Sequence, residues 1–184
     1  MLNLTDREWK EFFIGGEGGI FSIKHGKRLT VAEMTKGTIP FIGATETNNG
    51  ITNWVGVMNC SYDKNVLGVN YNGSVAEAFY HGYGCVFSDD VKRLHLKEVE
   101  DNKYILLFIA TVIKLQKVKY TYGYKFSGNR MNRQIILLPV DEAGKPDYAF
   151  MEQFIKERED LKRKQYITYA QRKIQYIEDG GGGY

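Results

Sequence analysis

The C-terminal part of the chain is predicted to form one helix that the preceding residues cannot cover. Pro146 followed by Asp147 is a helix start signal, because proline suits the first turn and an acidic residue favours the N-terminus. The helix then runs from residue 147 to about 179, where the glycines 180–183 end it. At helical rise such a segment is roughly 50 Å long, so a domain of 146 residues cannot bury its whole length. The chain is therefore expected to fold as a domain with a protruding helix that needs a partner helix.

Residues at near-heptad spacing mark one side of this helix. They are Met151, Phe154, Arg158, Leu161, Gln165 and Tyr169. Charged residues of both signs fill the other sides, and Arg158 and Gln165 interrupt the seam, which indicates a weak coiled coil. We expect contacts with a second helix from Met151, Phe154, Leu161 and Tyr169. The alternative is a helix that packs on its own domain and then frays.

The residues before the helix indicate one α+β domain, with a twisted β-sheet and short helices. Alternating apolar and polar residues, with the turn signals Asn49-Gly50 and Asn72-Gly73, predict strands. The expected strands lie in residues 20–23, 37–43, 51–57, 66–71, 76–80, 84–88 and 134–140. The expected helices are residues 102–117 and 30–34, and residues 6–13 form a short amphipathic segment. The predicted organisation is a domain of residues 1–146, the helix of residues 147–179 and a glycine-rich tail of residues 180–184.

Apolar side chains within these elements supply the candidate core. The central helix is expected to be buried, and its helical spacing falls on Tyr104, Leu107, Phe108, Thr111, Val112 and Leu115. The expected core residues elsewhere include Phe41, Phe79 and Leu137. Pro139, Asp147, Phe150 and Met151 are expected to fix the point at which the long helix leaves the domain.

A stretch without acidic residues lies between Lys103 and Val140. Its basic residues are Lys103, Lys114, Lys117, Lys119, Lys125, Arg130 and Arg133, and tyrosines and side-chain amides lie among them. Basic side chains attract phosphates, and aromatic and amide groups can contact bases. Because the net charge of the whole chain is only +3, the basicity is local, as it is in a nucleic-acid-binding surface. An ordinary solvated basic face is the alternative.

Cysteine and histidine positions give no metal-binding or nucleophile pattern. Cys60 and Cys85 stand alone and the three histidines are scattered, so neither a zinc site nor a cofactor is expected. Two lone thiols suit a reducing cytoplasm, which is the expected location. No apolar run approaches the length of a membrane span. The glycines of residues 15–19 lack the ending of a phosphate-binding loop.

Acidic residues offer one catalytic alternative, a nuclease with a carboxylate site near Asp89 or Glu98. Asp89-Asp90 suits an exposed turn, however, and Glu98 precedes the central helix, where acids favour the N-terminus. A nucleotide fingerprint suited to a methyltransferase is also absent from the sequence. We therefore expect a binding protein without catalytic activity of its own.

Three stretches together resemble a known family. The first consists of residues 26–29 (GKRL), 37–45 (GTIPFIGAT) and 48–51 (NNGI); the second of residues 71–74 (YNGS) and 78–80 (AFY); the third of residues 136–141 (ILLPVD), 144, 146–148 (PDY) and 150–152 (FME). Their order and spacing resemble the target-recognition domain of restriction–modification specificity subunits, of the type I subunit S and the related type IIB kind. The likeness extends to about Lys156.

The resemblance implies a fold, a function and partners. In that family a mixed α/β domain recognises one half of a bipartite double-stranded DNA site. A long helix follows, pairs with its counterpart, sets the spacing of the half-sites and docks the methyltransferase subunits, which hold the enzymatic activities. An interaction or regulatory protein that binds methyltransferase subunits through its helix, without contacting DNA, is the alternative.

The chain departs from the usual family pattern in one respect. Usual members carry two recognition domains and two long helices, whereas this sequence holds one of each and no internal repeat. We expect either a half-subunit that forms a homodimer through antiparallel helices, with a symmetric interrupted DNA site, or a fragment of a longer subunit.

Candidate DNA-binding residues are chosen by charge and hydrogen-bonding capacity. Those expected to hold phosphates from one turn are Lys24, Lys27 and Arg28. Those expected to meet base edges from polar loops are Thr45, Thr47, Asn48, Asn49, Asn72 and Ser74. For Asn48 and Asn49, ordinary turn chemistry is an equal alternative. The strongest candidates, from the basic stretch, are Tyr122, Tyr124, Lys125, Arg130, Asn132 and Arg133.

Overall fold

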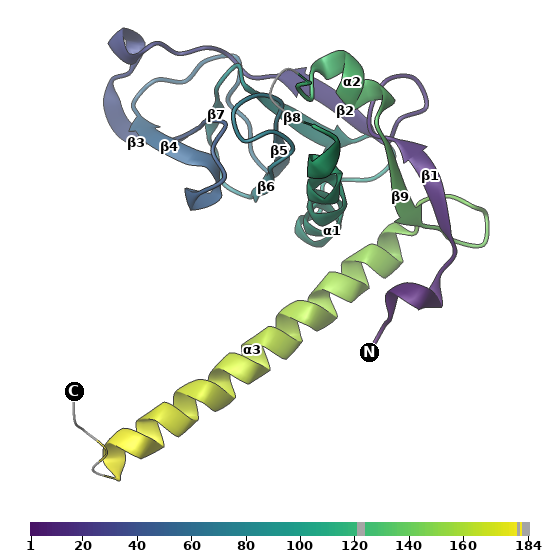
Figure 1. The fold of residues 1–184 in the computed structure, drawn as a ribbon. Helices are drawn as coiled ribbons and strands as arrows, with labels where there is room; N and C mark the ends of the chain where they lie inside the picture. Colours follow the sequence, from purple (N-terminus) through teal and green to yellow (C-terminus); the bar gives the residue numbers. More distant parts are fainter. Residues whose placement is uncertain (121–123, 180, 182–184) are drawn as a thin grey trace.

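The computed structural model describes residues 1–120, 124–179 and 181. Nine strands and three α-helices occur in these ranges, with one helix extending far from the rest (Figure 1). The strands are β1 (Trp9–Phe13), β2 (Phe21–His25), β3 (Lys36–Ile42), β4 (Ile51–Val55), β5 (Val66–Asn70), β6 (Ala78–His81), β7 (Val86–Phe87), β8 (Val91–Leu96) and β9 (Ile135–Pro139). The helices are α1 (Lys103–Lys114), α2 (Gly128–Arg133) and α3 (Tyr148–Glu178).

The strands form three small sheets. The largest has the order β2-β8-β5-β6 and is antiparallel throughout. A second sheet has the order β4-β3-β7, in which β3 and β4 form the hairpin that Asn49-Gly50 predicts and β7 pairs with β3 in parallel. β1 pairs with β9 in a third. The α+β class and the strands expected from the sequence are confirmed, and residues 9–13 of the N-terminal amphipathic segment form β1.

Three elements were not predicted as such: β1, which was expected only as an amphipathic segment, β8 and α2. β8 lies between β2 and β5 and carries Lys92, Arg93 and His95, which make the segment polar in sequence. These side chains are tolerated because they have polar partners: Arg93 Nη1 lies 3.0 Å from Asp63 Oδ2, and His95 Nδ1 lies 2.6 Å from Asp101 Oδ2.

The main core lies between the largest sheet and α1. The buried face of α1 consists of Ile105, Leu106, Phe108, Ile109, Ala110 and Ile113. The helix was predicted, but most of the predicted seam is on its other side, where Thr111 is exposed and Leu115, just past the helix, is 69% exposed. The other side of α1 is apolar too, because it packs against α3. The rings of Phe108 and Phe154 lie 5.8 Å apart there, edge to face. Phe41 and Phe108 are buried as expected and Phe79 is half-buried, but Leu137 is 51% exposed, so the core assignment of Leu137 is wrong.

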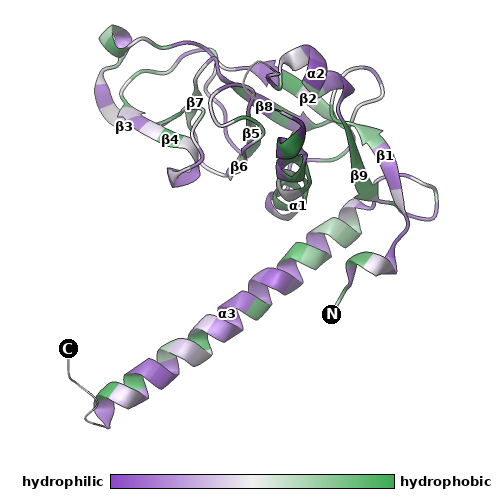
Figure 2. Ribbon diagram, viewed as in Figure 1, coloured by the Kyte–Doolittle hydropathy of each residue, from purple (hydrophilic) through white to green (hydrophobic). Residues whose placement is uncertain are grey.

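The long helix begins where the sequence predicts. Asp147 is its N-cap, and its Oδ1 accepts a hydrogen bond from the backbone N–H of Phe150 at 2.9 Å. Phe150 and Met151 are buried in the domain, and Phe154 packs on α1. The helix is then exposed from residue 162 to residue 179, except for half-buried Ala170. Figure 2 shows isolated apolar bands on this mainly hydrophilic distal half.

Met151 and Phe154 therefore have a different environment from the one the heptad pattern suggests. Met151 is 0% exposed and belongs to the core of its own domain, and Phe154 faces α1. Met151 is therefore not available to a second helix, and Phe154 already packs on α1 of its own domain. Within the described residues, none of the helices combines the length and apolarity needed to cross a lipid bilayer.

Candidate nucleic-acid interface

Four loops meet at one end of the largest sheet. Because β2 and β5 end there and the antiparallel β8 begins there, the segments 26–28, 71–74 and 88–90 lie together. The backbone N–H of Lys27 donates to the carbonyl oxygen of Phe87 at 2.8 Å, and that of Ser74 donates to the carbonyl oxygen of Ala44 at 3.2 Å, which adds segment 44–50. We call residues 26–28, 44–50, 71–74 and 88–90 the loop surface. It brings together candidates that are up to about fifty residues apart in sequence.

Turn chemistry explains part of segment 44–50. Asn48 and Asn49 have left-handed φ values of 50° and 53°, which asparagine tolerates better than most residues. The side-chain amide of Asn49 donates to the hydroxyl of Tyr83 at 3.0 Å. Thr45 and Thr47 share a hydrogen bond between their hydroxyls at 3.1 Å. Asn48 is thus the exposed side chain of this turn that has no hydrogen-bond partner among the residues the structure describes.

The next loop is tied into the surface by its own side chain. The amide of Asn72 donates to Asp90 Oδ1 at 2.9 Å, so Asn72 links segments 71–74 and 88–90. Ser74 is half-buried beside Ala44. Asn72 therefore holds the loop surface together through its side-chain amide, and Ser74 does so through its backbone N–H.

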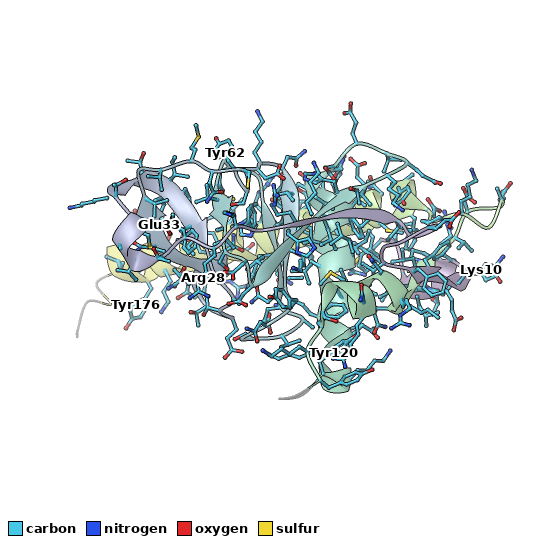
Figure 3. The ribbon with its side chains drawn as sticks, turned by 90° about the horizontal axis from the view of Figure 1, so that it is seen from above. Lys10, Arg28, Glu33, Tyr62, Tyr120 and Tyr176 are labelled. Carbon is cyan, nitrogen blue, oxygen red and sulfur yellow. The ribbon has the colours of Figure 1, made fainter. Side chains whose placement is uncertain are left out.

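The helix α2 extends the loop surface on the other side of β2. The guanidinium carbon of Arg130 lies 3.7 Å from the centroid of the Tyr124 ring, and its Nη1 donates to the carbonyl oxygen of Lys125 at 2.8 Å. Arg133 and Lys125 are exposed. Tyr122 lies outside the described residues. Figure 1 shows α2 and β2 on the side of the domain away from α3, and Figure 3 shows Tyr120, which leads into this region, at the edge opposite Tyr62.

Three cations of the acid-free stretch are paired with carboxylates from elsewhere. Lys103 Nζ lies 3.1 Å from Glu159, and Lys114 Nζ and Lys117 Nζ each lie 2.9 Å from Glu77. Burial favours a raised pKa for the Glu77 carboxyl, but hydrogen bonds from Lys117 and Lys114 outweigh it and lower that pKa. The number of basic residues in the stretch is therefore larger than the number of free positive charges on the folded surface. The cations without an acidic partner among the described residues are Lys119, Lys125, Arg130 and Arg133.

Lys24 does not share a turn with Lys27 and Arg28, contrary to expectation. Lys24 lies within β2, where side chains alternate between the two faces of the sheet. It faces the side of Arg93 and Asp63, whereas its neighbours Ile23 and His25 face α2. Lys27 and Arg28 follow the strand and are exposed on the loop surface.

The remaining polar groups of the domain do not form a nucleophile or metal site in the described residues. Burial raises the pKa of the Cys85 thiol to about 12 and lowers the pKa of His81 to about 4. Groups of His, Cys, Asp and Glu suited to a metal ion are also absent from these residues. Asp89 and Glu98 lie at opposite ends of β8, a strand of roughly 20 Å, so they do not share one site.

An apolar groove of about 660 Å³ lies at the base of α3. Its walls come from β1, α1, β9 and α3, and they include Trp9, Leu115, Leu137, Phe154 and Ile155. Leu115 and Leu137 are more than half exposed there. The elements that line the groove meet at the base of α3, and Figure 1 shows this end of the domain on the side away from α2 and β2.

Sequence reasoning missed several residues of the interface. His25, Asn129 and Lys92 lie beside the candidates but were not among them, because β2, β8 and α2 are far apart in sequence. Asn129 is one of the amides of the acid-free stretch, so a local signal was available for it. A weak signal was available for His25, which stands two residues before Lys27.

Comparison with known proteins gives consistent matches. Residues 6–169 match the family described as type I restriction modification DNA specificity domain. The chain is 58% identical over 160 residues to the type II restriction enzyme BgcI specificity subunit S.BcgI of Heyndrickxia coagulans, a match covering 87% of this chain and 46% of that protein. The chain thus spans about half the length of this relative.

Solved structures show the same fold at low sequence identity. The S subunit of a type I restriction–modification system from M. genitalium is similar with a TM-score of 0.56 and 19% identity, over 90% of this chain and 43% of that one. A chain from a structure on complex assembly and conformational transition of the type I R-M system matches with a TM-score of 0.59 and 16% identity, over 91% and 43%.

Proposed function

The chain belongs to the type I restriction modification DNA specificity domain family, and from this membership we propose that it recognises one half of a bipartite double-stranded DNA target. The methyl-transfer and cleavage reactions are assigned to partner subunits. The main support for this proposal is that the loop surface and α2 lie together on the side of the domain away from α3.

Phosphate contacts are assigned to the cations on this side. They are Lys27, Arg28, Lys125, Arg130 and Arg133. Arg130 is held in place by its stacking on Tyr124, so less side-chain entropy is lost when it binds a phosphate. Base contacts are assigned to the polar side chains between these cations, with Asn48 and Asn132 foremost and Tyr122 and Tyr124 as stacking groups.

A DNA selection experiment with matched salt dependence tests this function. The purified chain should enrich a short motif from random-sequence duplexes, and binding should weaken steeply as salt rises. The double substitution Arg130→Ala with Arg133→Ala should reduce the slope of log K against log salt by about two, since each phosphate contact contributes about one. The control, Lys162→Ala with Arg163→Ala on exposed α3, removes the same charge elsewhere and should leave the slope unchanged. Absence of both enrichment and salt dependence would overturn the proposal.

The long helix is proposed to pair with α3 of a second copy and to dock methyltransferase subunits. Ile167, Ala170, Ile174 and Ile177 alternate at spacings of three and four residues, and the three isoleucines are 47%, 56% and 67% exposed. In an antiparallel pair with full overlap, this segment lies beside residues 149–159 of the second copy. Those residues include Phe154 and Ile155, which line the apolar groove. The contacts expected at Leu161 and Tyr169 lie on a different side of α3 from these isoleucines, since Leu161 is six residues before Ile167 and Tyr169 is two after it, so they stay a separate prediction.

A further inference from the structure

His25 and Lys92 form a hydrogen-bonded pair that the candidate site above does not use. The two residues are directly opposite each other in the β2–β8 ladder. Lys92 Nζ lies 2.7 Å from His25 Nδ1 and 4.0 Å from the centroid of the Tyr71 ring. Lys92 is only 3% exposed, whereas His25 is exposed. A buried cation therefore supports a histidine at the surface.

The chemistry of this hydrogen bond fixes the tautomer of His25. An ammonium group has three N–H donors and no acceptor, so the Nδ1 atom of His25 must accept. In a neutral imidazole the proton then resides on Nε2. The positive charge of Lys92, followed by burial and the charge of Arg93, lowers the pKa of His25 and so favours the neutral ring. Burial lowers the pKa of Lys92, while Asp89 and Asp90 oppose this lowering and the Tyr71 ring favours the ammonium. His25 thus carries an Nε2–H donor of fixed identity.

His25 lies in a polar hollow of about 260 Å³ between β2 and α2. The hollow is lined by Ile23, His25, Ser127, Gly128, Asn129 and Asn132. Asn129 is exposed and Asn132 is half-buried, and among the described residues neither side-chain amide has a hydrogen-bond partner. A Cβ added at Gly128 would meet nothing within 4 Å, so the hollow is open on that side.

The composition of the hollow matches a base edge better than a phosphate. Two amides and a neutral imidazole offer donors and acceptors side by side, and Ile23 offers an apolar surface. Asparagine pairs with the N6 and N7 atoms of adenine, and an N–H donor suits the acceptor atoms N7 and O6 of purines. The cations of the interface lie beside the hollow, on α2 and in residues 26–28, where they suit the phosphates.

We propose that the hollow formed by His25, Asn129 and Asn132 binds a purine edge of the DNA half-site, with Lys92 as the positioning residue that fixes His25 as a hydrogen-bond donor. This inference rests on the proposed DNA recognition. The inference adds one base-contacting site to that proposal. It also predicts which chemistry the site selects, namely a base edge whose acceptor atom faces the imidazole of His25.

Selection from random-sequence duplexes tests the site directly. Asn129→Ala and His25→Phe should bind random duplex DNA within about twofold of the unsubstituted chain, because the cations remain. At one position of the enriched motif, the preference should fall by about tenfold, as expected when a hydrogen-bonded base contact is lost. Lys24→Met, on the opposite face of β2, is the matched control and should preserve the motif. Asn129 is exposed, so its substitution leaves the core intact.

Nitrogen-15 spectroscopy of the histidine side chains tests the role of Lys92. At pH 7.5 the His25 signal, identified by its loss in His25→Phe, should show a protonated Nε2 and an unprotonated Nδ1. In Lys92→Met the two tautomers should mix, and the preference at the same motif position should relax. A protonated Nδ1 in the unsubstituted chain would overturn the assignment to Lys92, whether or not Lys92→Met folds.

The outcomes separate this inference from the function on which it rests. A motif that is unchanged in Asn129→Ala and His25→Phe would overturn the hollow as a base-binding site and leave DNA recognition standing. Failure of the unsubstituted chain to enrich any motif would overturn the proposed function itself.

Discussion

The Nζ atom of Lys117 lies 2.9 Å from the Oε1 atom of Glu77, whose side chain is almost completely buried. Glu77 also accepts from Lys114, and Lys117 reaches Glu46 on the loop surface at 3.3 Å. These ion pairs connect the end of α1 to β6 and to segment 44–50. Lys114 and Lys117 of the acid-free stretch therefore stabilise the structure of the candidate interface.

Replacement of Glu77 tests this support. Glu77→Gln should destabilise the domain by about 1–3 kcal/mol, since it weakens two charge-assisted hydrogen bonds, leaves Lys114 without a counter-charge and leaves Lys117 with Glu46 alone. The lowered pKa of Glu77 means that its contribution is present above its unfolded pKa and is lost as pH falls through its folded value. Urea unfolding at neutral and acidic pH measures both effects. Glu46→Gln, at a side chain 60% exposed, is the control and should change stability by less than about 0.5 kcal/mol.

Sequence patterns predicted the elements whose signals are local. Asn49-Gly50 predicted the β3–β4 hairpin, and Pro146-Asp147 predicted the start of α3. β8 was missed because its polar residues are neutralised by Asp63, about thirty residues away in sequence, and by Asp101. Partners at that distance leave no periodic signal in the strand itself.

The same limitation applied to the candidate site. Segments 26–28, 44–50 and 71–74 were selected from the sequence because loops rich in threonine, asparagine and lysine are visible there, but their meeting in one surface was not predicted. The hollow between β2 and α2 was not predicted either, because about a hundred residues separate Ile23 from Asn129. Leu137 was assigned to the core because an apolar side chain in a strand is usually buried, whereas here it lines an open groove.

A second prediction concerns pH and the opposite face of the sheet. His95 lies between two carboxylates, with Nδ1 2.6 Å from Asp101 and Nε2 3.0 Å from Asp63. The hydrogen bond to Asp101 raises the pKa of His95, burial opposes this, and Asp63 adds to the increase. Because the folded pKa is raised, the stabilisation by His95 is fully present below its unfolded pKa and is lost as pH rises through the folded pKa. The free energy of unfolding of the unsubstituted chain should therefore exceed that of His95→Gln most clearly near pH 5.5, and the difference should shrink by pH 9. A difference that stays constant over this range would contradict the charged state assigned to His95.

A third prediction concerns the close approach of two loops. A Cβ added at Gly26 would lie 1.9 Å from the carbonyl oxygen of Ser88, so Gly26→Ala forces the backbone of residues 26–28 away from segment 88–90. We expect a loss of about 1–3 kcal/mol, as for other overpacked sites, and weaker DNA binding, because Lys27 and Arg28 are displaced. Gly128→Ala is the control, since a Cβ there meets nothing within 4 Å and the position is helical. It should leave stability unchanged or raise it by up to about 1 kcal/mol. Equal destabilisation by both substitutions would contradict a steric cause.

The exposed half of α3 gives the last prediction. If the isoleucines at residues 167, 174 and 177 pair with a second copy, light scattering of the isolated chain should give twice the chain mass of 21.1 kDa. Ile167→Glu with Ile174→Glu should reduce the mass to that of one chain, because each charge would be buried in the helix pair. The matched control, Thr168→Glu with Gln175→Glu, adds the same charge one residue later, on the outward side of the same helix turns, and should leave the dimer intact. Since the chain spans about half the length of its relative S.BcgI, a monomer in every case would contradict pairing between copies and instead favour a second long helix from a longer subunit as the partner of α3.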